Sequence, residues 1–240
     1  MPILRYPGGK WNIRRQLTPW LKELILGETD YCEPFIGGGA VAYQTVVACG
    51  TPGQDRLRHI WLNDADPGIA ALWATVVGGW TTLVNLIDRL PQRPTIAEYR
   101  QVAQSEPTSD LERAYQRLYL NRCNFGGLHK ATPMGGLSQT GRYKIDHCWN
   151  KDEMYYCFHH FHLMLHNVSV VTCLDFHDFL FKHSERALFL DPPYRAVNGV
   201  ARMYGAAMSA RDHRDLAAIL KGCRKWVMTL DNCPEVRKLY

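Results

Sequence analysis

The sequence has no apolar run long enough to span a bilayer, since a membrane helix takes about 20 apolar residues. Residues 1–10 contain no apolar core of the kind that a secretion signal requires. The chain has 8 cysteines but no C-x-x-C pair and no regular spacing, which is typical of reduced thiols in a cytosolic protein. We therefore expect a cytoplasmic protein without a membrane partner.

Internal repeats and low-complexity tails are also absent from the sequence. At 240 residues, with 46% apolar and 21% charged residues, the chain has the size and composition of one large α/β domain, or of one domain that carries an insertion. The net charge of +5 is compatible with a polyanionic partner but does not establish one.

Basic residues gather in the middle of the chain. Between residues 117 and 151 the acidic residue is Asp146 alone, and the basic residues are Arg117, Arg122, Lys130, Arg142, Lys144 and Lys151. A solvated helix face would explain such a run, but glycine pairs at 126–127 and 135–136 interrupt the helical periodicity. We therefore expect a basic loop or hairpin at residues 122–144 that contacts a polyanion.

The stretch Asp191-Pro192-Pro193-Tyr194 follows the apolar run 187–190. Such a run, ending in a carboxylate, predicts a buried parallel strand that delivers an acid to the end of a sheet. Two prolines fix φ and have no N–H, so the turn is stiff and its carbonyls stay available as acceptors. An acid, a rigid turn and the flat ring of Tyr194 suit a planar group that carries an amine, such as a nucleobase. We assign a catalytic role to all four residues as a hypothesis.

Two glycine turns precede predicted helices. The Gly-Gly-Lys turn at residues 8–10 presents backbone N–H groups beside a lysine, which suits a carboxylate or phosphate, although any helix entry can carry a lysine. The three glycines at residues 37–39 follow a predicted strand at 31–35, and their missing side chains let a ligand approach the backbone. The spacing is not G-x-G-x-x-G, so an ordinary tight connection between strand and helix stays open.

The next predicted strand, residues 58–62, leads to Asp64. An acid at this point of a nucleotide-binding sheet is placed to accept from two ribose hydroxyls, and we favour this role. The alternative is that Asp64 caps the helix that begins at Pro67 or Gly68.

Other elements are predicted around these motifs. Thr18, just before Pro19, is predicted to cap an early helix. Prolines divide residues 81–121 into three predicted helical pieces. Further strands are predicted at 168–171 and 225–230, and residues 195–207 form a candidate lid.

Four histidines, His159, His160, His162 and His166, lie in a predicted helix. His159, His162 and His166 share one face, which is an arrangement found in zinc sites. No carboxylate or cysteine completes a strong spacing, so we expect ordinary helix side chains and no bound metal.

Taken in order, these motifs resemble the Dam-like (D12 class) DNA adenine-N6 methyltransferases along essentially the whole chain. The stretches that carry the resemblance are RYPGGK (5–10), EPFIGGG (33–39), NDAD (63–66), LNRCNFGGL (120–128), GRYK (141–144), DF (175–176) and DPPY (191–194). The resemblance implies an α/β fold with the Rossmann-like sheet of S-adenosylmethionine-dependent methyltransferases and an inserted, mainly helical target-recognition domain. It implies a catalytic domain at residues 1–92 and 167–240, and an inserted domain at 93–166.

The resemblance also implies site roles, position by position. Cofactor contacts are implied for Tyr6, Gly8, Gly9, Lys10, Glu33, Pro34, Phe35, Gly37, Gly38, Gly39, Asp64, Asp175, Phe176 and Asp191. DNA contacts are implied for Arg5, Arg122, Asn124, Phe125, Gly126, Leu128, Lys130, Arg142 and Lys144. Within these sets, Lys10 would hold the methionine end of the cofactor and Asp64 its ribose. Asp191 would accept from the target amine beside the Pro192 carbonyl, and Tyr194 would stack on the extruded base.

The implied reaction is methyl transfer from S-adenosylmethionine to the N6 amine of an adenine flipped out of duplex DNA, with S-adenosylhomocysteine as product and GATC as the first candidate site. The implied setting is a bacterial or phage-infected cell. An RNA adenine-N6 methyltransferase, a methyltransferase acting on another amine and a non-catalytic DNA-binding relative stay open. Members of the family usually have an Asn at the position of Gly126 and a further strand pair after the position of Tyr240.

Overall fold

The computed structural model of the protein describes residues 2–5, 8–49, 57–166, 169–193 and 208–240. Its strands are β1 (Asp30–Glu33), β2 (His59–Asn63), β3 (Ser169–Thr172), β4 (Ala187–Leu190) and β5 (Lys225–Met228). Its helices are η1 (Lys10–Asn12), α1 (Thr18–Leu24), α2 (Ala40–Cys49), α3 (Pro67–Val77), α4 (Trp80–Arg89), α5 (Ile96–Gln104), α6 (Asp110–Cys123), η2 (Phe125–Gly127), α7 (Lys151–Leu165), α8 (Phe176–His183), α9 (Ala210–Leu220) and α10 (Pro234–Leu239).

The strands form one sheet in the order β3-β2-β1-β4-β5, and every neighbouring pair is parallel. Tyr31 of β1 stands opposite Ile60 of β2 and Ala187 of β4. The sequence predicted all of these strands, with ends displaced by at most two residues. The strand order reverses between β1 and β4, and open α/β sheets bind their ligands at such a switch point, outside the carboxyl ends of the strands.

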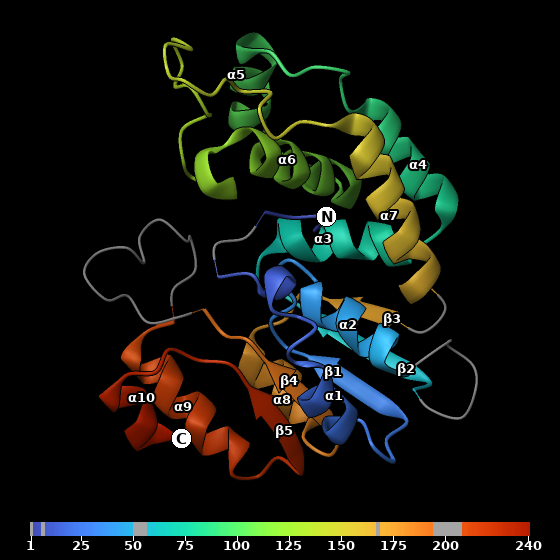
Figure 1. The fold of residues 1–240 in the computed structure, drawn as a ribbon, viewed down its shortest axis with the longest axis vertical. Helices are drawn as coiled ribbons and strands as arrows, with labels where there is room; N and C mark the ends of the chain where they lie inside the picture. Colours follow the sequence, from blue (N-terminus) through green and yellow to red (C-terminus); the bar gives the residue numbers. More distant parts are fainter. Residues whose placement is uncertain (1, 6–7, 50–56, 167–168, 194–207) are drawn as a thin grey trace.

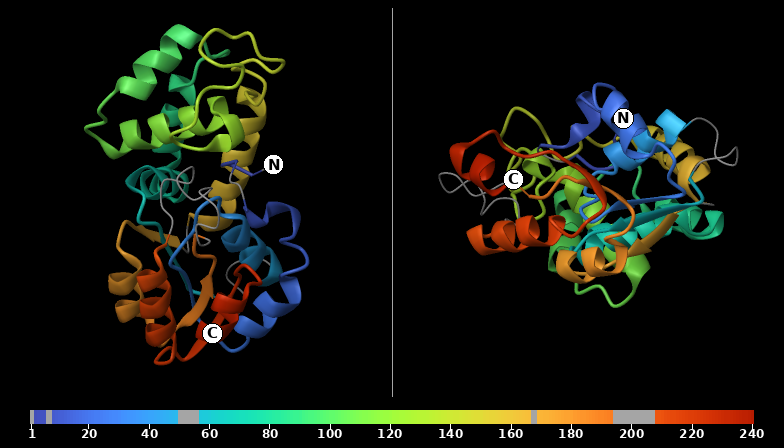
Figure 2. Two further views of the ribbon diagram at one scale, coloured as in Figure 1. Left: turned by 90° about the vertical axis from the view of Figure 1, so that its left-hand side faces the viewer. Right: turned by 90° about the horizontal axis from the view of Figure 1, so that it is seen from below.

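Helices cover both faces of the sheet, with α1 and α2 on one side and α8 and α9 on the other (Figure 2). Because successive strand residues point to opposite faces, Tyr31 and Phe189 enter the core beneath α1 and α2, while Cys32 and Leu188 pack with α8 and α9. All of β4 is buried, as its continuous apolar run predicts for a central parallel strand. This confirms the predicted α/β fold.

Helices α4, α5 and α6 and much of α7 gather beyond α3, at the end of the molecule away from the sheet (Figure 1). This region has a small core of its own, formed by Tyr99, Tyr119, Leu120, Cys123 and Ile145. It is not separate from the sheet, because Ala114 and Leu118 of α6 join the main core. An ion pair between buried Arg117 of α6 and Asp66 also ties α6 to the start of α3.

The predicted division of residues 81–121 into three helices is confirmed, and two of the three start at capping boxes. The side chains of Thr95 and Ser109 each accept from a backbone N–H of the first turn. In return, the backbone N–H of each residue donates to a glutamate side chain of that turn. Two expectations were wrong. Thr18 is the first residue of α1 and Leu17 is its N-cap, and α6 continues to Cys123, so the basic loop begins after Arg122.

We predict that Gly39→Ala destabilises the fold more than Gly27→Ala does. Both glycines have positive φ, +68° and +77°, where alanine is strained by about 1–2 kcal/mol. A Cβ at Gly39 would lie 2.1 Å from the Trp73 ring, which is fully buried, whereas a Cβ at Gly27 meets nothing within 4 Å. Overpacking should add about 1–3 kcal/mol at Gly39 alone.

Urea unfolding of the two variants measures this difference. Gly27→Ala is the matched control, since it carries the same backbone strain without the collision. Equal losses of unfolding free energy would contradict the prediction, because the Trp73 contact would then have no consequence.

Candidate functional site

One buried side chain, the amide of Asn63, ties together the segments that follow three neighbouring strands. Its Nδ2 donates to the carbonyl oxygens of Pro34 at 3.1 Å and Leu174 at 2.9 Å. Its Oδ1 accepts from the Thr172 hydroxyl at 2.7 Å and from the Leu174 N–H at 2.9 Å. Because the amide is satisfied through both of its polar atoms, it fixes the carboxyl edge of β1, β2 and β3.

Asp191 follows β4 at the same edge, and its carboxylate is held from two sides. Lys10 Nζ lies 2.6 Å from Oδ1 and 2.8 Å from Oδ2, and the Thr229 hydroxyl donates to Oδ1 at 2.6 Å. The same ammonium donates to the Gly8 carbonyl oxygen at 2.9 Å. The Lys10 side chain is 6% exposed and that of Asp191 22%, so water screens the ion pair poorly. These contacts fix the orientation of the carboxylate.

Glu33 brings a second carboxyl group to this edge at the end of β1. It is 2% exposed, and the Tyr31 hydroxyl donates to its Oε1 at 2.6 Å. Burial raises the pKa of Glu33 to about 8, the Tyr31 hydrogen bond opposes the rise, and the negative charge of Asp191 adds to it. At neutral pH the group therefore keeps its proton, and the site has one negative charge fewer than its carboxyl groups suggest.

Asp64, after β2, contacts the glycine turn of residues 37–39. Its Oδ2 accepts from the Gly37 N–H at 3.0 Å, and its Oδ1 accepts from the Asp66 N–H at 3.0 Å. Burial raises the pKa of Asp64 to about 6, while the Gly37 hydrogen bond and the Arg117 charge oppose the rise. The N-cap of α3 is Asp66, so the alternative of Asp64 as the cap of this helix was wrong.

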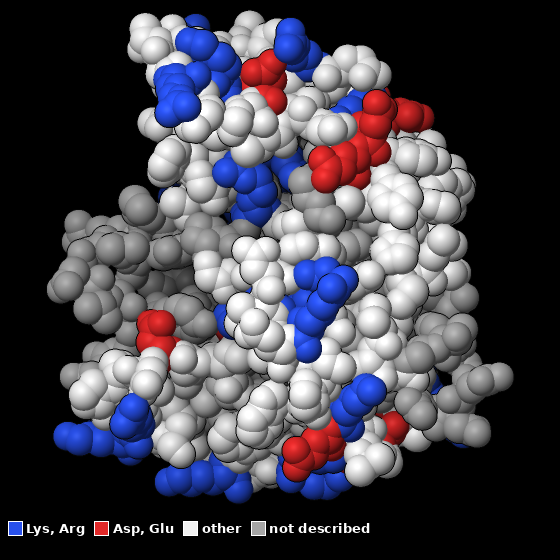
Figure 3. All heavy atoms as spheres, in the orientation of Figure 1, with Lys and Arg blue, Asp and Glu red and all other residues white. Residues whose placement is uncertain are grey.

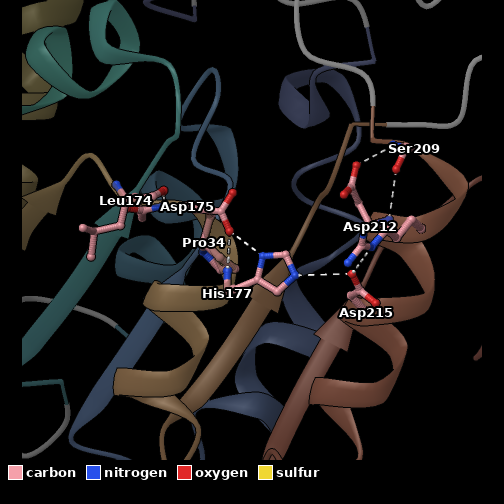
Figure 4. Close-up of polar contacts among 9 residues, drawn as sticks. Pro34, Leu174, Asp175, His177, Ser209, Asp212 and Asp215 are labelled. Atoms are coloured by element: carbon pink, nitrogen blue, oxygen red, sulfur yellow. Dashed lines mark hydrogen bonds and ion pairs between the residues drawn. The ribbon is translucent and has the colours of Figure 1, made fainter.

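Aromatic and acidic residues lie after β1 and at the start of α8. The rings of Phe35 and Phe176 lie 5.9 Å apart. Asp175 caps α8 by accepting from the His177 N–H at 2.9 Å, and the His177 ring lies between Asp175 and Asp215 of α9 (Figure 4). The imidazole thus links the start of α8 to α9 next to the Phe35–Phe176 pair.

The structure brings the predicted cofactor residues of β1, β2 and β4 to one edge, and Lys10 with them. Tyr6, Tyr194 and the candidate lid at 195–207 lie outside the described residues. Sequence reasoning missed three contacts: the Lys10–Asp191 pair, the Thr229 bond and the Asn63 bridge. The signal for Thr229 was available, because it lies near the carboxyl end of the strand predicted at 225–230, and this end must reach the edge that holds Asp191.

The basic loop is anchored by two buried asparagines at the end of α6. Asn121 accepts from the Arg5 N–H at 2.8 Å and donates to the carbonyl oxygens of Arg5 and Gly127, each at 2.8 Å. Asn124 donates to the Leu128 carbonyl oxygen at 2.8 Å and accepts from the Tyr99 hydroxyl at 2.8 Å. The N-terminal segment and the loop are therefore held in a fixed relation.

Arg122 has a structural role in this arrangement. It is 1% exposed, and its guanidinium donates to the carbonyl oxygens of Pro2 at 2.9 Å and Ile3 at 2.5 Å. Neither Arg122 nor Asn124, which is also buried, is placed for the direct DNA contact that we expected. Leu128, 8% exposed, is equally enclosed.

The remaining residues expected to contact DNA are accessible. Phe125 is 67% exposed, and Lys130, Arg142 and Lys144 are also exposed. In the space-filling view, lysine and arginine side chains lie over this end of the molecule and also along the opposite end (Figure 3). An aromatic ring among basic side chains is a surface that suits a nucleic acid.

A comparison with known protein families shows what these features belong to. The family described as "D12 class N6 adenine-specific DNA methyltransferase" matches residues 6–240. The chain belongs to this family. The reaction of this family requires a methyl donor, and its substrate is DNA.

Curated relatives of this D12 methyltransferase are similar to it at low identity. The DNA N-6-adenine-methyltransferase of Escherichia phage P1 is 26% identical over 251 residues, which cover 99% of this chain but 31% of the phage protein. The DNA adenine methylase of Haemophilus influenzae is 26% identical over 236 residues, or 93% of this chain and 75% of that protein. The type II methyltransferase M.MjaIII of Methanocaldococcus jannaschii is 24% identical over 213 residues, 82% of this chain and 70% of that protein.

Two further observations concern the parts of this D12 methyltransferase that the structure describes. None of the helices there combines the length and the apolar character that crossing a membrane would demand. Within the same ranges, no group of three or more His, Cys, Asp or Glu residues is arranged to hold a metal ion. His162, one of the histidines of the suspected zinc face, instead has its Nδ1 2.7 Å from the Val76 carbonyl oxygen.

We predict that Glu33→Gln becomes increasingly stabilising as the pH rises. The unfolded Glu33 loses its proton near pH 4.5, whereas burial holds the pKa of the folded group at about 8. Between these values the folded methyltransferase binds the additional proton, so its stability falls by about 1.4 kcal/mol per pH unit through this one group. Glutamine keeps an acceptor for Tyr31 and cannot ionise.

The measurement is urea unfolding of both proteins from pH 5 to pH 8. The difference in unfolding free energy should grow with pH, since other titrating groups, Asp64 among them, contribute equally to both. A difference that does not change over this range would show that Glu33 ionises normally in the fold.

Proposed function

We propose that this D12 methyltransferase transfers a methyl group from S-adenosylmethionine to the N6 amine of an adenine in duplex DNA. The observation that carries the proposal is the carboxylate of Asp191, fixed by Lys10 and Thr229 at the switch point of a parallel sheet. The rigid turn of Pro192 and Pro193 follows it directly. With DNA as its substrate, the protein would act in the cytoplasm of a bacterium or of a phage-infected cell.

The residues present suit this cofactor. Both oxygens of Asp64 accept one backbone N–H each and keep lone pairs for two ribose hydroxyls. Phe35 and Phe176 offer apolar ring faces for the adenine, and the Gly8 turn with Lys10 suits the carboxylate of the methionine end. When bound, the cofactor supplies an electrophilic methyl group on a sulfonium.

Asp191 and the Pro192 carbonyl would orient the target amine. The N6 lone pair of adenine is delocalised into the ring, so the amine is a weak nucleophile. Hydrogen bonds from its two N–H groups to the carboxylate and to the carbonyl oxygen favour a pyramidal nitrogen whose lone pair points at the methyl group. The contribution of these residues is positioning rather than proton abstraction in the ground state.

Base flipping would bring the adenine to this edge. Extrusion from the duplex costs a few kcal/mol. Stacking on Tyr194, worth about 1–3 kcal/mol, would offset part of this. We assign residues 93–166 to target recognition, with Phe125 of the basic loop as a candidate wedge for the gap and Arg5, held beside it by Asn121, as a candidate base contact.

Methyl transfer is tested with tritium-labelled S-adenosylmethionine and two unmethylated duplexes that differ only in the presence of GATC. We expect N6-methyladenine in the GATC duplex and a loss of about 10²–10³-fold for Asp191→Ala, because the amine loses its charged acceptor. Asp88→Asn, an exposed aspartate of α4, is the matched control. Cofactor binding should survive both substitutions.

The other outcomes separate the alternatives. Transfer to both duplexes would keep the enzyme and discard GATC. Transfer to the corresponding RNA alone would identify an RNA methyltransferase. Cofactor binding with no transfer to either nucleic acid would identify a non-catalytic relative, and near-normal transfer by Asp191→Ala would refute the assignment of Asp191.

We predict that Lys130→Gln weakens DNA binding without changing sequence preference. Lys130 is exposed on the basic loop, where it suits a phosphate rather than a base. Loss of one phosphate contact should lower the slope of log affinity against log salt concentration by about 1. Lys221→Gln, an exposed lysine after α9, is the control.

Titration of a fluorescent duplex at several salt concentrations gives the slope for each variant. An unchanged slope for Lys130→Gln, or an equal change for Lys221→Gln, would remove the basic loop from the proposed DNA surface.

A further inference from the structure

Lys10 and Asp191 are 181 residues apart in the sequence and meet at the carboxyl edge of the sheet. The ammonium contacts both carboxylate oxygens, at 2.6 Å and 2.8 Å, and the Gly8 carbonyl oxygen at 2.9 Å. The lysine assigned to the cofactor is therefore engaged with the residue assigned to the substrate.

The contact that orients the Asp191 carboxylate also weakens it as a hydrogen-bond acceptor. A carboxylate that accepts from an ammonium through both oxygens is a weaker acceptor for a neutral amine, because the adjacent positive charge withdraws electron density from it. Thr229 already occupies a further position on Oδ1. The amine of adenine would gain a stronger acceptor if Lys10 moved away while Thr229 kept the carboxylate in place.

Lys10 can move only to another anion. A lysine that is 6% exposed is strongly destabilised without a counterion, so its departure from Asp191 requires a replacement. Its four-carbon stem is flexible and its ammonium is a compact charge, which allows a short displacement without a change in the backbone. Gly8, with φ of +76°, and Gly9 form the turn beside it, the position expected to receive the carboxylate of the cofactor.

We propose that Lys10 is a positioning residue that exchanges partners: it holds Asp191 in the cofactor-free protein and moves to the carboxylate of the cofactor, which releases Asp191 for the adenine amine. The inference rests on the proposed function. The exchange leaves Lys10 with one carboxylate partner throughout, since one ammonium–carboxylate pair replaces another. Cofactor binding is thereby coupled to the readiness of Asp191 for the base.

Glu33 does not interfere with this exchange at neutral pH. Burial raises the pKa of Glu33 to about 8, so this neighbour of Asp191 is protonated and offers Lys10 no competing carboxylate. Tyr31, its hydrogen-bond donor, is fully buried. Asp191 is thus an anionic partner of Lys10 on the protein, and the carboxylate of the ligand would be another.

The test is a calorimetric binding cycle that needs no DNA. S-adenosylhomocysteine is compared with 5′-(3-aminopropylthio)-5′-deoxyadenosine, which keeps the ammonium and lacks only the carboxylate. Each ligand is titrated into the unsubstituted protein, Lys10→Met, Asp191→Asn and the double variant. Thermal unfolding verifies that each variant is folded.

Asp191→Asn should bind S-adenosylhomocysteine roughly fivefold to tenfold more tightly than the unsubstituted protein, because Lys10 no longer has to leave a carboxylate. The ligand without the carboxylate should bind both proteins equally. In the Lys10→Met background the same Asn substitution should have no such effect, which removes the direct influence of the Asp191 charge from the comparison. If Lys10→Met does not fold, the two ligands on Asp191→Asn decide alone.

Unchanged or weaker binding of S-adenosylhomocysteine by Asp191→Asn would overturn the exchange, as would equal tightening of both ligands. Failure of S-adenosylhomocysteine to bind at all would overturn it together with the proposed cofactor. The proposed function has its own readout in methyl transfer, so an active methyltransferase without the ligand-specific effect would refute the exchange alone.

Discussion

Because the strands β1 to β5 all run in one direction, the residue that follows each of them arrives at the same edge of the sheet. The site is a direct product of this geometry. Asp64 follows β2, Asp191 follows β4 and Thr229 follows β5, so residues scattered along the sequence become neighbours. The buried amide of Asn63 then fixes the carboxyl ends of β1, β2 and β3 relative to one another.

Three carboxyl groups at one partly buried edge would repel one another if all were charged and unpaired. The protein stabilises each of them differently. Asp191 has the Lys10 ammonium, Glu33 retains its proton, and Asp64 accepts from the backbone N–H groups of Gly37 and Asp66. Each carboxyl group at this edge is therefore stabilised by contacts of its own.

The sequence was sufficient for much of this organisation. Apolar runs located the strands, prolines located the breaks between α4, α5 and α6, and the position of Asp191 after a buried strand placed the carboxylate correctly. Contacts between distant segments could not be obtained in the same way. No local pattern tells that Lys10 reaches Asp191, or that Arg122 is turned inward to the carbonyl oxygens of Pro2 and Ile3 instead of outward to a ligand.

The buried arginine illustrates why basic residues in a loop-rich stretch are ambiguous. Arg122 and Lys130 are both basic and lie close together in the sequence. Arg122 lies on the last turn of a helix that packs on the N-terminal segment, whereas Lys130 lies beyond this helix. The difference arises from tertiary packing, which a single sequence expresses only weakly. Asn124 is likewise turned inward, since its amide donates to the Leu128 carbonyl oxygen within the loop.

Contacts between segments far apart in the sequence also decide when the site can form during synthesis at the ribosome. β1 pairs with β4 through Tyr31 and Ala187, and Thr229, close to the C-terminus, secures Asp191. Contacts so distant in sequence close late, because the loop entropy must be overcome before they stabilise the chain. A nascent chain that has already formed β1 and β2 still cannot hold Asp191 as the finished protein does. The site around Asp191 therefore takes its final form only after the segment that carries Thr229 has been synthesised.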